Sequence, residues 1–181
     1  MPTLPHIDLS TPDGAERFTL HCMRYIEEIF SAQQSLEPLV CLFLTKDPIT
    51  GLVVGQTPQI VFIDVGAAFS NPDTKQTFAT GLRRLAAQGE AIGLVMASEA
   101  WMMEAKPGGP PLDLSIPTSQ HPNRYEAILL SIEHRTGART WIARIHRDPN
   151  GPARLETWHA LPSAQTMGIL TNLLGPPSAK N

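Results

Sequence analysis

Three acidic side chains lie at the expected ends of apolar segments, and they are the residues of this chain best placed for chemistry. Asp64 closes one apolar run, Glu99 follows the most continuously apolar run, and Glu104 opens a long loop. Carboxylates at neighbouring strand ends raise one another's pKa or share a divalent cation. They therefore predict, as one hypothesis, an acid–base or metal-assisted hydrolase. The alternative is a structural ion pair, in which Glu99 pairs with a buried arginine such as Arg144 or Arg124.

The histidines are a weaker candidate for a metal site. His134, His146 and His159 are expected on three consecutive strands. The turns that set the strand register leave His146 and His159 about 20 Å apart or on opposite faces, whereas zinc ligands must lie within about 2 Å of one point. The chain contains no C-x-x-C, H-E-x-x-H or G-x-S-x-G motif. We therefore expect no metal site at the histidines and no cofactor.

The three tryptophans suggest a binding surface instead of a reaction. Trp101 is followed directly by Met102 and Met103, and Trp141 and Trp158 are expected on later strands of the same sheet. If these side chains are exposed together, they form a protein-binding or dimer surface. If they are buried, they are ordinary core residues.

The composition is that of a globular protein without a bias toward nucleic acid. Hydrophobic residues make up 42% and charged residues 17% of the 181 residues, and the formal net charge is -3. This length favours a single domain over 1–181, with loose termini at 1–10 and 176–181. With no leader-like N-terminus and no run of roughly 20 apolar residues, we expect a cytoplasmic protein without nucleic-acid or membrane partners. Cys22 and Cys41 lie in apolar patterns, which indicates buried, reduced thiols.

Hydrophobic periodicity and turn residues predict the elements that position these side chains. The first helix is expected over 13–34 and the second from 71 to a stop at Gly89. Strands are expected over 39–45, 58–65, 91–101 or slightly beyond, 125–134, 139–147 and 154–160, and a final helix over 163–174. The order α-β-β-α-β-β-β-β-α predicts an α+β protein with a mainly antiparallel sheet of five or six strands and two or three helices. The first two helices are expected to cover one face.

The segment 105–123 is rich in proline and follows neither period, so it is predicted to be a long loop or an arm. Just before it, the strand ends in Ser98-Glu99-Ala100-Trp101, and a hairpin strand around Glu126 follows the loop. From Phe78 to Trp158 the chain resembles small uncharacterised bacterial and phage proteins, which share a strand ending in SEAW and a late hairpin. That resemblance implies the architecture and no particular activity.

Taken together, the patterns favour a non-catalytic binding or assembly module. A homodimer is expected, formed through the tryptophan and methionine surface or through the 105–123 segment. The carboxylate hydrolase is the alternative. The missing histidine and cysteine motifs favour binding, whereas an acid at the exit of a core strand favours a reaction site.

Overall fold

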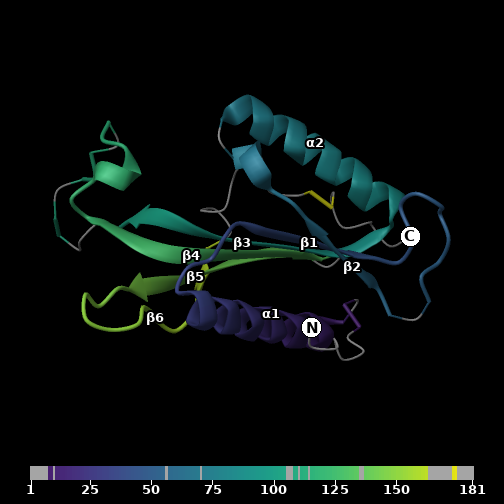
Figure 1. Cartoon of the computed structure of the whole chain (residues 1–181), viewed down its shortest axis with the longest axis horizontal. Helices are drawn as coiled ribbons and strands as arrows, with labels where there is room; N and C mark the ends of the chain where they lie inside the picture. The colour runs from purple at the N-terminus through teal and green to yellow at the C-terminus, as the bar shows by residue number, and fades with distance from the viewer. Residues whose placement is uncertain are drawn as a thin grey trace.

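The computed structural model describes residues 8–9, 11–55, 57–69, 71–104, 108–109, 111–113, 115–134, 137–162 and 173–174. These residues form one sheet with a helix on each face, α2 above it and α1 below it in the view of Figure 1. The predicted α+β class is confirmed.

Helix α1 spans Pro12–Gln33, within one residue of the predicted bounds at each end. Thr11 caps its N-terminus with a side chain that accepts a hydrogen bond from the backbone N–H of Gly14 at 3.1 Å, and proline is favoured directly after such a cap. Gln34 caps its C-terminus; it is left-handed at φ 61° and donates its N–H to the Phe30 carbonyl. The buried face of α1 repeats every three or four residues and includes Phe18, Cys22, Ile26 and Phe30.

The sheet is antiparallel at every pairing of the described strands, as predicted. Its strands are β1 (Leu39–Leu44), β2 (Gln59–Ile63), β3 (Ala91–Met103), β4 (Arg124–His134), β5 (Gly137–His146), β6 (Arg154–Leu155) and β7 (His159–Leu161). They lie in the order β2-β1-β3-β4-β5-β6, and β7 also pairs with β5. The single strand predicted over 154–160 is therefore two short ones. The break between them contains Trp158, which is anchored to α1.

The expectation that the first two helices share a face is wrong. On β1, Cys41 and Phe43 pack against α1, while Val40, Leu42 and Leu44 belong to the cluster under α2, which spans Pro72–Gln88. A strand that is apolar on both faces needs cover on both, so each helix takes one side. The end of α2 lies so close to β1 that a Cβ on Gly89 would approach the Leu44 side chain to 2.7 Å, which accounts for the glycine stop.

The predicted long loop and final helix are described only in part. Two short 3-10 helices, η1 (Gly66–Phe69) and η2 (Thr118–Gln120), lie in connections, and η2 contacts β3 and β4. The final helix predicted over 163–174 lies outside the described residues except for Leu173 and Leu174. The backbone N–H groups of these two residues donate to the buried carboxylate of Glu133 at 2.7 and 3.1 Å. Among the described residues, no helix is both long and apolar enough to cross a membrane.

Candidate binding site

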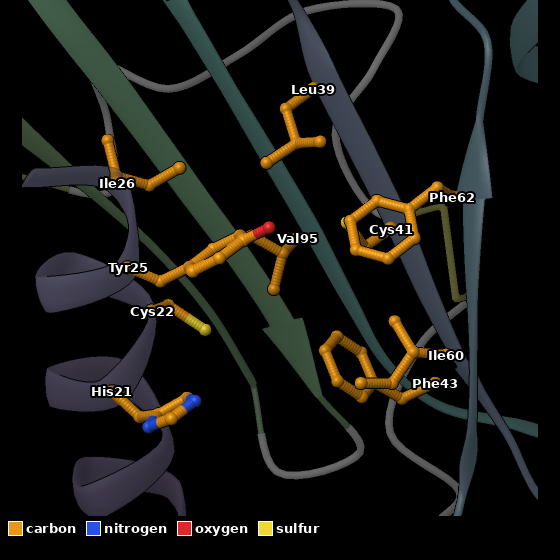
Figure 2. A pocket seen from close by; sticks show the side chains of 10 residues that line it. All are labelled: His21, Cys22, Tyr25, Ile26, Leu39, Cys41, Phe43, Ile60, Phe62 and Val95. Carbon is orange, nitrogen blue, oxygen red and sulfur yellow. The ribbon is translucent and has the colours of Figure 1, made fainter. Parts of the chain in front are cut away.

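An apolar pocket of about 60 Å³ lies between α1 and the β2 side of the sheet (Figure 2). We call it the β2 pocket; it is lined by His21, Cys22, Tyr25, Ile26, Leu39, Cys41, Phe43, Ile60, Phe62 and Val95. Sites for cofactors and drug-sized ligands commonly enclose about 300–1,000 Å³. This smaller, apolar space suits a single aliphatic side chain better than a nucleotide or an organic cofactor.

The repeat of side-chain directions along α1 and along the strands brings these side chains together. On α1, residues one turn apart lie on one face, so His21 and Tyr25 stand one above the other beside the buried Cys22. On the strands every second side chain faces α1, and in the register of β1 with β2, Phe43 lies opposite Ile60. Figure 2 shows the helix side chains facing those of β1 and β2 across the pocket.

The floor and the rim of the β2 pocket differ in how exposed their aromatic rings are. Phe43 is 5% exposed and meets Phe18 edge to face, with ring centroids 4.8 Å apart at 88°. Such a pair contributes stability beyond the burial of its area. Phe62, on the opposite side, is 40% exposed. A buried aromatic floor therefore lies beside an aromatic rim that a partner can still bury.

The two thiols in the pocket wall are not set up for nucleophilic chemistry. Cys22 and Cys41 are both free and buried, as expected from the sequence. Burial raises the pKa of each thiol to about 12, and the nearby Cys41 adds to the rise at Cys22. Only the thiolate is an effective nucleophile or metal ligand. Both thiols therefore act as small apolar groups near neutral pH.

The strand next to the pocket forms an edge of the sheet. Among the described strands, β2 pairs only with β1, so its outer backbone groups have no strand partner. Natural edge strands are commonly protected by charged residues or proline. The five residues of β2, QIVFI, contain neither; Pro58 and Asp64 lie just outside its two ends.

Further exposed apolar side chains lie in the loop that leads into β2. Ile49 is 93% exposed, and Leu52 and Val53 are each 69% exposed. The loop is held by Asp47, whose carboxylate accepts hydrogen bonds from the backbone of Ile49 and Thr50. Its shape is thus maintained although its apolar side chains lie in solvent. Contiguous exposure of this kind marks interaction surfaces more often than isolated exposed residues do.

The structure gives each of the three predicted carboxylates its own partner. Asp64 accepts a hydrogen bond from the N–H of Gly66 at 2.8 Å. Glu104 pairs with Arg144 at 2.7 Å. Glu99 and Glu104 are an odd number of residues apart, so Glu99 faces α1 while the end of the strand directs Glu104 to the other side. Within the described residues no three histidine, cysteine or acidic side chains are arranged to hold a metal ion.

Glu99 belongs to an ion-pair group that fastens α1 to the sheet. Its carboxylate accepts the N–H of Leu36 at 2.8 Å and pairs with Arg147 at 3.0 Å. The guanidinium also binds Glu126, which raises the pKa of Arg147, and donates to the Gln34 carbonyl at 2.9 Å. We call Arg147, Glu99 and Glu126 the Arg147 cluster. Glu99 is thus held by an arginine, as the structural alternative required, although by a different one from those suggested.

The residues of the predicted tryptophan and methionine surface do not lie together. Trp101 is 41% exposed and lies under the Arg124 guanidinium, 4.9 Å from the ring centroid. Its neighbour Met102 points to the opposite face of the sheet. Trp141 packs on the α1-side core, four residues along β4 from Trp101, a separation of about 14 Å in the strand direction. Trp158 packs against the same core and donates its indole N–H to Glu27 of α1 at 2.7 Å.

A second and larger hollow, of about 670 Å³, lies between the first half of α1 and the adjoining ends of β4 and β5. Its wall is partly polar, with Glu16, His134 and Arg139 beside Trp141. Burial and the nearby Arg139 lower the pKa of His134. His134 and Gly137 of its lining flank residues 135–136, which lie outside the described residues.

The sequence contained a partial signal for the β2 pocket. QIVFI was predicted as a strand, and the cysteines were predicted to be buried. What the pattern cannot reveal is which strand lies at the edge, because that depends on the order of strands in space.

A scan against models of protein families, a search of curated proteins and a search of solved structures each found no match.

Proposed function

We propose that this protein is a non-catalytic binding module that accepts an extended, apolar segment of a protein partner along the edge of β2. The observation that carries the proposal is an uncharged edge strand directly beside an apolar pocket with a half-exposed aromatic rim. An added strand would pair with the outer backbone groups of β2, which have no partner among the described strands, and side chains on one of its faces would point toward the pocket.

The partner's chemistry follows from the pocket wall. The thiols of Cys22 and Cys41 are neutral, and the polar ends of His21 and Tyr25 belong to α1, across from the strands. A charged side chain placed here would lose its hydration without an opposite charge on β2 to replace it. The segment should therefore present aliphatic or aromatic residues at alternate positions and no proline where it pairs.

The contacts of the three carboxylates do not favour the alternative of a hydrolase. Glu99 and Glu104 are each held by an arginine, and Asp64 caps a turn. A general base or metal ligand needs a lone pair that is free to reach substrate or cation. In this arrangement the geometry supports structural roles for the three acids.

An array of capped heptapeptides tests the proposal. Each peptide has the pattern Thr-X-Thr-X-Thr-X-Thr, which places every X side chain on one face of an extended strand. We expect purified protein to bind peptides in which X is Phe, Leu, Ile or Val, and to ignore those in which X is Asp, Lys or Pro. The probe requires no knowledge of the natural partner.

A matched pair of variants assigns the binding to a surface. Phe62→Lys and Trp101→Lys alter two aromatic residues that are 40% and 41% exposed. Lysine on an edge strand is a natural protection against strand addition, so Phe62→Lys should weaken binding at least about tenfold, and Trp101→Lys should change it by less than about twofold. The proposal fails if no apolar peptide binds, or if the two variants bind equally well.

A further inference from the structure

We infer that the strand bound at the edge of β2 is the β2 strand of a second copy of this chain, so that two sheets join across a two-fold axis at Val61. This inference rests on the proposed function and names its partner. It places the predicted homodimer at a surface other than the tryptophan and methionine surface or the 105–123 segment.

The sequence of β2 is self-complementary in an antiparallel pairing. A two-fold axis between antiparallel strands must pass through a pair of directly opposite residues, so one residue lies opposite itself. With Val61 on the axis, Ile60 faces Phe62 of the second copy and Gln59 faces its Ile63. Aromatic and β-branched residues opposite one another are favourable cross-strand pairs, and this pairing creates two Ile–Phe pairs and one Val–Val pair.

The residues that flank β2 favour this register over its neighbours. An axis at Ile60 would place Pro58 opposite Phe62 of the second copy, and proline has no N–H to donate. An axis at Phe62 would place the carboxylate of Asp64 opposite Ile60, where no opposite charge lies on the strand. An axis at Val61 keeps both Pro58 and Asp64 outside the paired segment and uses all five residues of the strand.

Charge does not oppose the assembly. With Val61 on the axis, the two copies of Asp64 lie at opposite ends of the paired strands, six residues apart, or about 20 Å. That exceeds the screening length of about 8 Å at physiological salt. Strand addition would satisfy about four to six backbone hydrogen bonds, depending on which residues of β2 point outward.

The β2 pocket and its rim fit the same arrangement. Ile60 and Phe62 point to the α1 face, where Ile60 packs on the core and both line the pocket. In the joined sheet both copies of α1 lie on one face, because the axis is perpendicular to the sheet. Phe62 of each copy then lies against Ile60 of the other, at the mouth of that copy's pocket. The half-exposed ring, which is costly for a monomer to display, becomes part of the interface.

Cysteine crosslinking tests the pairing residue by residue. Val61→Cys places two introduced thiols directly opposite each other, within the range of separations that a disulfide can close. Gln59→Cys is the matched control on the same face of β2, since its two copies would be about 14 Å apart. Under mild oxidation we expect at least about ten times more covalent dimer from Val61→Cys than from Gln59→Cys. The native thiols are buried, so the unmodified protein should give little.

Sedimentation velocity tests the assembly without any covalent bond. The unmodified protein at about 1–200 µM should shift from monomer toward dimer. Phe62→Lys should raise the dissociation constant at least about tenfold, and Trp101→Lys should leave it within about twofold. If Trp101→Lys abolishes dimer formation and Phe62→Lys preserves it, the inference is overturned and the dimer interface lies at the tryptophan and methionine surface.

The failure of this inference can be separated from failure of the proposed function. If the protein stays monomeric throughout this range and Val61→Cys gives no more dimer than Gln59→Cys, the second copy is not the partner. The heptapeptide array then decides the wider question. If apolar peptides bind the unmodified protein and not Phe62→Lys, the β2 edge remains a binding site for another protein. If no peptide in the array binds, both proposals are overturned.

Discussion

The α1 face of the sheet carries two regions of opposite character. At one edge the β2 pocket is apolar, and Phe62 beside it is 40% exposed. Farther along β3, the Arg147 cluster is charged, and Arg147 binds two carboxylates and a backbone carbonyl. The charged region attracts attention in the sequence, yet its groups already have intramolecular partners. The apolar edge has an exposed ring and a row of backbone groups without a partner among the described strands.

The difference shows why charge alone is a poor guide to a site. A carboxylate near the end of a strand is equally suited to holding one end of a helix in place, and Glu99 does so at the C-terminal end of α1 through Leu36 and Arg147. An edge strand without protecting charges has no such intramolecular use. Binding capacity is therefore better judged from what remains unsatisfied than from residue type.

The largest expected effect lies at the pocket floor. Phe43→Ala removes a ring that is 5% exposed and in edge-to-face contact with Phe18, and should lower the free energy of unfolding by about 3–4 kcal/mol. Urea unfolding followed by circular dichroism measures the change. Phe62→Ala, at the rim, is the matched control and should cost less than about 1 kcal/mol. Equal losses at the two positions would mean that floor and rim do not differ as described.

A smaller loss is expected in the Arg147 cluster. Arg147→Met leaves Glu99 and Glu126 without their shared cation, and because all three side chains are 27–42% exposed the cost should be about 1–2 kcal/mol. Arg144→Met is the control; its partner Glu104 is 67% exposed, and the change should cost about 0.5 kcal/mol. Urea unfolding at low and high salt checks both values. An Arg147→Met protein as stable as the original would show that the cluster does not fasten α1.

The buried thiols predict an alkaline loss of stability. The pKa of Cys22 is 9.0 ordinarily and about 12 in the folded protein. Above pH 9 the unfolded chain loses a proton that the folded protein retains, so stability is full below pH 9 and falls by about 1.4 kcal/mol per pH unit up to pH 12. Between pH 7 and 10, Cys22→Ala should therefore lose about 1.4 kcal/mol less than the unmodified protein. An identical loss in both proteins would contradict the buried, neutral thiol.

The smallest effects on stability are expected at the two exposed aromatics. Phe62→Lys and Trp101→Lys should each lower the free energy of unfolding by no more than about 1 kcal/mol, with the loss at Trp101 arising from its contact with Arg124. Thermal unfolding of the two variants side by side checks this. Their effects on peptide binding should nonetheless differ widely, and a folding defect in Phe62→Lys would show up here before it could be mistaken for a binding defect.

Local elements were predictable because their signals are local. The first helix was predicted to within one residue at each end, and the second was predicted to start one residue before Pro72 and to stop at Gly89, which directly follows its last residue. The fold class followed from the predominance of hairpin connections. These features need only the residues within a few positions of one another.

The arrangement of the helices and strands in space was harder to predict from the sequence. Placing α1 and α2 on one face ignored the fact that β1 buries side chains on both. That Arg147, and not Arg144, reaches Glu99 depends on the registers of β3, β4 and β5 together. The position of β2 at the edge likewise has no counterpart in the sequence pattern. The candidate site is formed by these long-range relations, and for that reason the sequence pointed to other residues.

Amide hydrogen exchange tests the central claim most directly, because it compares the two regions in one experiment. The protein is measured at about 1 µM, where we expect it to be mainly monomeric, alone and with the heptapeptide that binds best in the array. Strand addition at β2 predicts slower exchange confined to residues 59–63 and their loop, with residues 99–103 unchanged. Slower exchange at 99–103 and 124–126, with 59–63 unaffected, would contradict the account and move the binding site to the charged end of the sheet.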